Sequence, residues 1–373
     1  MTEVGAVRTE QAVRSGQAAN RWQVQDVRWH HGGRQLVPVE HAPFGRALPY
    51  RRAAGQSPLP GCLPLVRSRG WTADLGQQGL ADMLLGLASV VGLREVTPGL
   101  PLHYSGPRAR LMRRCSLPMT TSEAWGPHIV RTGTRSPVRF RVDAEEPPAW
   151  LDHLGPGQVE VHGALPMRHY LSMEQQLGVR LSLDDTPAPL FRSEEWAVPW
   201  HVVLVLSAGS PQCSYGPAEF AAVATEMMRT RSAPWRFTAV VPRTLRSAPD
   251  LDELCTRVVQ APDPADCVDL FASAEVVVGV DNGLTQLAAL TARPDGSGPQ
   301  VVGLYARRSH TKWITGSRRH HAVATRFAQM LALADRSPGR DELDEEVWGD
   351  AADLRCVPRS RVADFAGRCA GWW

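Results

Sequence analysis

The chain has 373 residues, with 41 basic and 38 acidic side chains and a formal net charge of +3. This length exceeds one ordinary hydrophobic core and suits two domains. A hydrophobic fraction of 43% and a charged fraction of 21% are normal for an enzyme, and the small net charge argues against a nucleic-acid partner or an electrostatic membrane partner.

Targeting and redox signals are also weak in this sequence. No apolar run reaches the roughly 18 residues that a membrane span needs. The first residues are polar and include Glu3 and Arg8, so no signal peptide is visible. The seven cysteines are scattered without C-x-x-C spacing, which favours reduced thiols over disulfides or zinc ligands. We therefore expect a cytoplasmic protein with no integral membrane segment.

The first 60 residues are expected to be an N-terminal extension. Two alternating runs flank His31-Gly32-Gly33, which predicts a hairpin, and residues 43–60 are rich in Pro, Gly and Arg, as is typical of a connector.

Residues 61–185 are expected to form a first α/β domain. An apolar helix over 82–96 is stopped by Pro98-Gly99. Periodicity and composition predict a strand at 62–66, a long loop at 67–79, further strands at 100–104, 129–130, 138–142 and 159–161, a helix at 167–177 and a hinge at 183–189.

Residues 186–350 are expected to form a second α/β domain, and residues 351–373 a closing helix at 358–369. The pattern predicts strands at 202–206, 237–241, 276–280 and 301–304, and helices at 217–229, 250–259, 267–272 and 284–292. This alternation favours a parallel sheet with helices on both faces, whose ligands lie beyond the carboxyl ends of the strands.

The segment 274–290 carries the strongest signal for a binding site. A buried strand at 276–280 runs into Asp281-Asn282-Gly283, and a helix begins near Leu284. A helix start leaves backbone N–H groups without internal partners and carries the positive end of the helix dipole, so it is suited to a phosphate. The other interpretation is an ordinary strand-turn-helix unit.

Two segments together resemble the bacterial ADP-heptose:lipopolysaccharide heptosyltransferases, glycosyltransferase family 9. Ala81-Asp82 opens the first-domain helix where the family has Gly-Asp. The stretch Asp281-Asn282-Gly283-Leu284-Thr285-Gln286-Leu287-Ala288-Ala289 is similar to the family's Asp-Ser/Thr-Gly-(Pro/Leu)-x-His-Leu-x-Ala-Ala. The resemblance covers roughly residues 62–315. It implies a GT-B fold, in which two Rossmann-like α/β/α domains face a cleft and a C-terminal helix crosses back to the first domain.

The resemblance makes Asp82 the candidate catalytic base, although an aspartate at a helix start also serves as an N-cap. For the donor diphosphate and sugar we expect backbone amides and hydroxyls at the helix start, with Gln286 in place of the family's His. Basic residues after the last strand would supply the missing cation. The full set of expected donor-binding residues is Ser207, Gly209, Ser210, Asp281, Asn282, Gly283, Leu284, Thr285, Gln286, Arg307, Arg308 and Lys312.

Other motifs fit their structural interpretations better. Asp250-Leu251-Asp252 matches a D-x-D metal motif but sits at an expected helix start, where acids favour the dipole. The pairs His30-His31 and His320-His321 lack metal-ligand spacing and are expected in turns on the surface. Neither a nucleophile elbow nor a P-loop is present.

The sequence therefore predicts an inverting, metal-independent glycosyltransferase without a cofactor. Its expected partners are a nucleotide sugar, ADP-heptose by the resemblance, and a small-molecule or glycolipid acceptor. If the source is a GC-rich Gram-positive organism, as the single lysine, Lys312, suggests, antibiotic biosynthesis is the expected setting. The alternatives are a nucleotide-sugar epimerase of similar fold and a non-catalytic nucleotide-binding scaffold.

Overall fold

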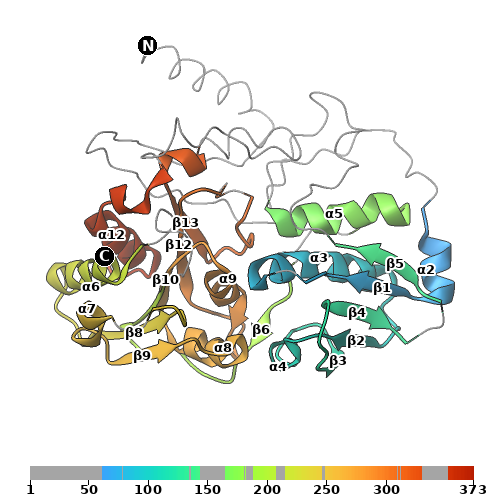
Figure 1. Ribbon diagram of the computed structural model, residues 1–373, viewed down its shortest axis with the longest axis horizontal. Coiled ribbons are helices and arrows are strands. Elements are labelled where there is room, and N and C mark those ends of the chain that lie inside the picture. The colour runs from blue at the N-terminus through green and yellow to red at the C-terminus, as the bar shows by residue number, and fades with distance from the viewer. Residues whose placement is uncertain are drawn as a thin grey trace, which may run out of the picture.

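The computed structural model describes residues 61–77, 79–133, 136–142, 164–179, 181, 188–206, 215–245, 248–308, 310, 312–329 and 352–373. These residues form two α/β units that lie side by side (Figure 1). The expected N-terminal extension, the strand expected at 159–161 and most of the expected hinge lie outside them. Within the described residues, no helix is both long enough and apolar enough to cross a bilayer.

The first unit is built on a mixed sheet with the strand order β3-β2-β4-β1-β5. Strand β4 is antiparallel to both of its neighbours, and the other pairs are parallel. The elements of this unit are α2 (Leu63–Arg69), β1 (Trp71–Asp74), α3 (Leu80–Val96), β2 (Leu102–Ser105), α4 (Ala109–Met112), β3 (Met119–Ser122), β4 (Ile129–Thr132), β5 (Val138–Arg141) and α5 (Leu165–Leu177).

The second unit is built on a fully parallel sheet with the order β13-β12-β10-β7-β8-β9, as expected from its continuous apolar runs. Its elements are β7 (His201–Val205), α6 (Pro217–Thr230), β8 (Arg236–Val241), α7 (Pro249–Asp252), β9 (Arg257–Gln260), α8 (Pro264–Ser273), β10 (Val276–Val280), α9 (Gly283–Leu290), β12 (Gln300–Tyr305) and β13 (His320–Ala324).

Helices cover both faces of this parallel sheet. Successive side chains of β7 point to opposite faces of the sheet and enter two separate cores. Val203 and Val205 pack with α8 and α9, while Val202 and Leu204 pack with α6. The closing 3-10 turn η4 (Leu354–Cys356) and helix α12 (Arg359–Cys369) join the α6 side.

The two units share one continuous apolar core through α3 and α9. These two helices lie next to each other where the units meet (Figure 1). Helix α3 is buried nearly all round from Met83 to Val90, which explains why its sequence is apolar on every face. A short pairing of β6 (Phe191–Arg192) with β11 (Thr291–Ala292) also links the interdomain connection to the second unit.

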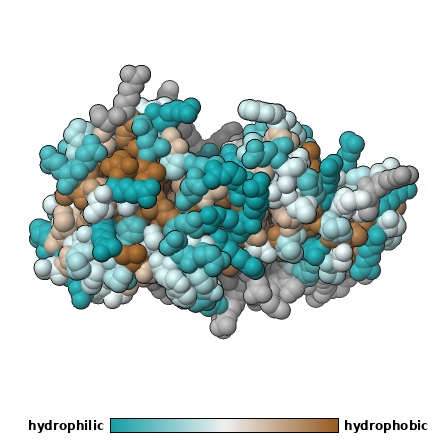
Figure 2. Space-filling model, turned by 90° about the horizontal axis from the view of Figure 1, so that it is seen from below, coloured by the Kyte–Doolittle hydropathy of each residue, from teal (hydrophilic) through white to brown (hydrophobic). Residues whose placement is uncertain are grey.

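Arginines in and just after α4 pair with aspartates at the start of α8 and within it, where the two units meet. Arg110 contacts Asp263 and Asp266 at 2.8 Å each, and Arg114 forms a bidentate pair with Asp269 at 2.5 and 2.6 Å. Seen from below, hydrophilic side chains cover the middle of the molecule, where the two units meet (Figure 2).

Several expected elements differ from those observed. Residues 62–66, expected to be a strand, begin helix α2, because Pro64 lies in its first turn. The first strand is β1, inside the segment expected to be a loop. The helix expected at 250–259 is instead the short α7 followed by edge strand β9.

The ends of the second domain also differ. His320 and His321, expected in a surface turn, begin strand β13, and His320 is buried. The closing helix is present, but α12 packs beside α6 on the second sheet. The expectation that this helix crosses back to the first domain is therefore wrong for the described residues.

Candidate active site

The strand-turn-helix unit at 276–290 lies at the carboxyl end of the parallel sheet, as expected. Strand β10 is buried throughout and ends at Val280. The backbone N–H of Asp281 donates to Leu304 of the neighbouring strand at 2.9 Å, and Asn282 is the N-cap of α9. Asp281 therefore stands at the edge of the sheet where ligands of parallel sheets bind.

The backbone N–H groups at the start of α9, which were expected to be open to a phosphate, already have a partner within the chain. The Asn282 side-chain oxygen accepts from the amides of Leu284 and Thr285, each at 2.9 Å. The Thr285 hydroxyl donates to the Val280 carbonyl at 2.7 Å and is buried. A phosphate would have to displace Asn282 to reach those amides, so the expectation of open donors at Leu284 and Thr285 needs this correction.

Gly283 has a packing reason for lacking a side chain. A Cβ atom built there would lie 2.6 Å from the Leu80 Cβ and 2.7 Å from the Ala81 nitrogen. The start of α9 thus touches the start of α3, and small residues on both sides permit this approach. Gly283 was expected to allow a ligand to approach the backbone, but Leu80 and Ala81 of the first unit occupy that space.

This contact brings Asp82 to the junction. Gly79 is the N-cap of α3, so Asp82 is the third helical residue and not the cap. The N-cap interpretation of Asp82 is therefore wrong, although an acid in the first turn still favours the helix dipole. The side chain is half-buried, and its carboxylate turns back toward Gly79.

The charges of Asp281 and Asp82 act on each other across the junction. The pKa of the Asp281 carboxyl is raised to about 6, chiefly by burial and in smaller part by the charge of Asp82, while the charge of Arg308 and a hydrogen bond with Gln286 oppose the rise. Two carboxylates in one site ionise less readily together than apart. Asp281 therefore keeps its proton to a higher pH than an ordinary aspartate does.

Arg108 and His128 belong to this site but were missed in the sequence. The charge of Arg108 interacts with Asp82, and its guanidinium donates to the Nε2 of His128 at 3.0 Å. The Nδ1 of His128 donates to the Gly76 carbonyl at 2.9 Å, and burial lowers the pKa of this imidazole. A neutral His128 thus orients Arg108 beside Asp82. The available signal was the position of Arg108 just after strand β2.

Gln286 does not replace the family's His as a charged group or as an exposed donor. Its side chain is buried, and its Nε2 donates to the Trp313 carbonyl at 3.1 Å. Because it also bonds with Asp281, Gln286 connects the candidate carboxylate to the loop after β12.

The three candidate cations after β12 have different surroundings. Lys312 is only 3% exposed, and its carbonyl accepts from the first residue of α5 at 2.8 Å. Arg307 is half-buried, and its charge acts on Asp353 in the C-terminal segment. Arg308 is exposed and lies over the Trp313 ring, 4.3 Å from the ring centre.

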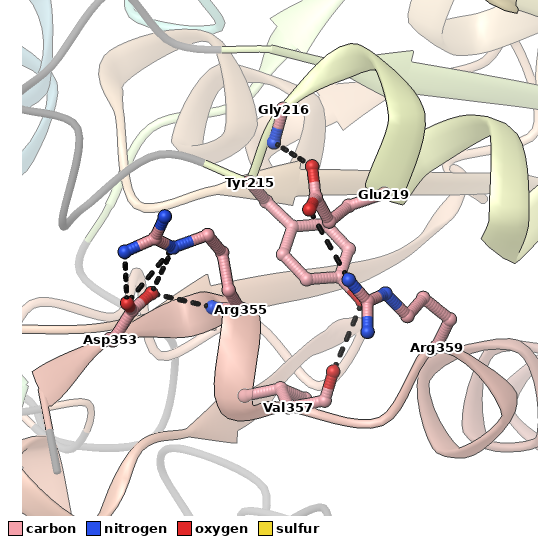
Figure 3. Close-up of polar contacts among 7 residues, drawn as sticks. All are labelled: Tyr215, Gly216, Glu219, Asp353, Arg355, Val357 and Arg359. Carbon is pink, nitrogen blue, oxygen red and sulfur yellow. Dashed lines mark hydrogen bonds and ion pairs between the residues drawn. The ribbon is translucent and has the colours of Figure 1, made fainter. Parts of the chain in front are cut away.

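Ser207, Gly209 and Ser210 lie outside the described residues. The helix that follows them, α6, is capped by its own Glu219, which accepts from the Gly216 amide at 3.1 Å (Figure 3). Glu219 also binds Arg359 of α12 at 3.2 Å, and the Tyr215 hydroxyl donates to the Val357 carbonyl at 3.3 Å (Figure 3). Hydrogen bonds to Val357 and Arg359 therefore hold the C-terminal segment beside the start of α6.

The side chains of the types that bind metals do not form a second site in the described part of the chain. Asp250 and Asp252 lie in the first turn of α7, as expected. No group of three or more metal-type side chains gathers among the described residues. A surface hollow between β9 and α8 is lined by Glu195, Arg257, Val259, Pro262, Asp266, Cys267, Asp269, Leu270 and Ser273, and it includes no expected site residue.

The two α/β units and their junction define the GT-B architecture. The fold is similar to that of the glycosyl transferase family 9 protein from Veillonella parvula, with a TM-score of 0.52 and 11% identity, covering 79% of this chain and 95% of that one. It is also similar to the E. coli heptosyltransferase WaaC solved with ADP, with a TM-score of 0.50 and 11% identity, covering 78% and 97%. No protein-family model and no curated protein matches the sequence.

Proposed function

We propose that this chain is an inverting glycosyltransferase that works at the junction of its two units. The observation that carries the proposal is the meeting of Asp82, at the start of α3, with Asp281, at the end of β10. The fold is shared with a heptosyltransferase that was solved with ADP, which supports a nucleotide sugar as the donor class.

In the proposed reaction, Asp82 is the general base. It accepts the proton of an acceptor hydroxyl while the acceptor oxygen forms a bond to the anomeric carbon. The bond between that carbon and the diphosphate breaks, and the nucleoside diphosphate leaves with the electron pair. Because the oxygen attacks opposite the leaving group, the configuration at the anomeric carbon inverts.

The electrostatics of the pair favour Asp82 over Asp281 for this role. Burial, together with the charge of Asp82, favours the protonated form of Asp281. A base must be ionised to accept a proton, and the raised pKa of Asp281 narrows the pH range in which Asp281 is ionised, so we assign the role of base to Asp82. Asp281, held by Gln286, is then suited to a hydrogen bond with a sugar hydroxyl.

The finer assignment follows the motif resemblance. The donor is proposed to be ADP-heptose, the acceptor a small-molecule or glycolipid hydroxyl in natural-product biosynthesis, and the transfer metal-independent. The enzyme is proposed to act in the cytoplasm without a cofactor.

A thermal-shift comparison of ADP, GDP, UDP and dTDP on the full chain tests the proposal, since a ligand that binds only the folded state raises the melting temperature. The largest shift is expected with ADP. A larger shift with another diphosphate would remove the ADP-sugar donor but keep the reaction class. Binding without turnover would favour a scaffold, and release of free sugar epimers would favour an epimerase.

A further inference from the structure

Hydrogen bonds anchor Trp313, in the loop that follows strand β12, near the carboxyl edge of the sheet. The Trp313 carbonyl accepts from Gln286 at 3.1 Å and from the Tyr305 hydroxyl at 3.4 Å. Tyr305 in turn contacts the Nε2 of His320 at 3.2 Å, and the Nδ1 of that ring accepts from the Thr315 amide at 3.3 Å.

The protons of this network can be assigned consistently. Because the Thr315 amide is a donor, the Nδ1 of His320 is the acceptor and its Nε2 carries the proton. That Nε2–H donates to the Tyr305 oxygen, which leaves the Tyr305 proton for Trp313. Burial lowers the pKa of His320 to about 3, so the imidazole is neutral, as this arrangement requires.

The fixed indole supports Arg308. The guanidinium lies 4.3 Å from the centre of the Trp313 ring, and Trp313 is only 6% exposed, so the arginine lies over an indole that is packed within the protein. A cation on an aromatic face is attracted by the negative charge of the ring's face. Arg308 therefore sits on a preformed support, while its own side chain is open to solvent.

Arg308 also acts electrostatically on the reaction site. Its charge acts on both Asp281 and Tyr305 at the ends of β10 and β12. Arg307 acts instead on Asp353, and the Lys312 side chain is buried. Of the three candidate cations, Arg308 combines exposure with a position beside Asp281.

We propose that Arg308 is the cation that neutralises the departing diphosphate. Its guanidinium lies over the Trp313 ring, and the Trp313 carbonyl is bound by Gln286 and Tyr305. This inference rests on the proposed function. The planar guanidinium can bind two phosphate oxygens at once, and charge that develops on the leaving group is best met by a group already in place. Because the start of α9 is capped by Asn282, a side-chain cation takes over the role expected of the helix amides.

The test is a calorimetric titration of the full chain with ADP and with AMP. Arg308→Gln is expected to weaken ADP binding about ten- to a hundred-fold, in line with losing charged hydrogen bonds. The loss for AMP, which lacks the second phosphate, is expected to be at least about ten-fold smaller. Arg308→Lys should show an intermediate loss, since it keeps the charge but not the fork.

Arg318→Gln is the matched control, because Arg318 is exposed and precedes β13 at the amino edge of the sheet, and its ADP affinity is expected to stay within about three-fold of wild type. Thermal melting checks that each variant is folded. Unchanged ADP affinity in Arg308→Gln, an equal loss for ADP and AMP, or an equal loss in Arg318→Gln would overturn the assignment of Arg308. If wild-type protein binds none of ADP, GDP, UDP and dTDP, the proposed function fails as well.

Discussion

The Asp82 carboxylate, on the first α/β unit, lies close enough to Asp281, on the second, for their charges to repel each other. Each also has an arginine from its own unit, since Arg108 acts on Asp82 and Arg308 acts on Asp281. The junction therefore holds two acids and two cations around the point where α3 meets α9. In such a site a carboxylate can accept a proton and an arginine can bind a diphosphate.

The raised pKa of Asp281 predicts a specific pH dependence of stability. The carboxyl has an ordinary pKa of 3.8 in the unfolded chain and about 6 in the folded protein, chiefly because of burial. Between about pH 4 and 6 the folded state binds more protons, so the free energy of unfolding contributed by Asp281 falls as pH rises.

Asp281→Asn removes this titration. We expect its stability relative to wild type to increase from pH 4 to pH 7, as measured by denaturant unfolding at several pH values. Asp250→Asn, which changes an exposed carboxylate on α7, is the matched control for an Asp-to-Asn substitution away from the junction. A pH-independent difference between Asp281→Asn and wild type would contradict the assigned shift.

Gly283 is expected to be intolerant of a side chain because of packing. An added Cβ would lie 2.6 Å from the Leu80 Cβ, so α9 and α3 would have to move apart. Gly283→Ala should cost about 1–3 kcal/mol of unfolding free energy, as overpacked cores do, and Gly283→Val more. Gly99→Ala, where a Cβ would meet nothing within 4 Å, is the matched control and should be nearly neutral. Equal stability of the two alanine variants would rule out the tight junction.

The Arg114–Asp269 pair is expected to couple the two units only weakly. The pair is bidentate and the Ser193 hydroxyl also donates to Asp269 at 2.7 Å, but the side chains are 31% and 39% exposed. A double-mutant cycle with Arg114→Gln and Asp269→Asn should give about 0.5–1 kcal/mol, reduced in high salt. A coupling that does not change with salt would indicate a contribution other than this ion pair.

The second unit was predictable in most of its elements because parallel, doubly covered strands produce continuous apolar runs. Residues 276–280 were predicted and observed as β10 with the same bounds. Strand β1 was missed because its polar Thr72 and Asp74 alternate with Trp71 and Ala73, and four residues are too few to establish that period.

The site was only partly predictable, because its remaining members depend on pairing between distant segments. Arg108 follows β2 and His128 precedes β4, and they meet because the sheet places β4 between β2 and β1. The sequence identified Asn282 as a cap-type residue but did not show that its oxygen occupies the amides of Leu284 and Thr285. The support of Arg308 by Trp313 depends on a buried His320 that was expected on the surface.

The most direct test of the account is release of nucleoside diphosphate from ADP-, GDP-, UDP- and dTDP-activated sugars in the presence of EDTA. It compares wild type with Asp82→Asn, with water or added hydroxyl compounds as acceptors. We expect wild-type protein to release ADP fastest, from an ADP-activated heptose, and Asp82→Asn to lose about 10²–10⁴-fold in rate with little change in ADP affinity. Release that requires an added divalent metal would contradict the metal-free mechanism. Equal rates of release by wild type and Asp82→Asn would contradict the role of Asp82 as the base. If no donor releases its nucleoside diphosphate, the proposed glycosyltransferase activity is contradicted.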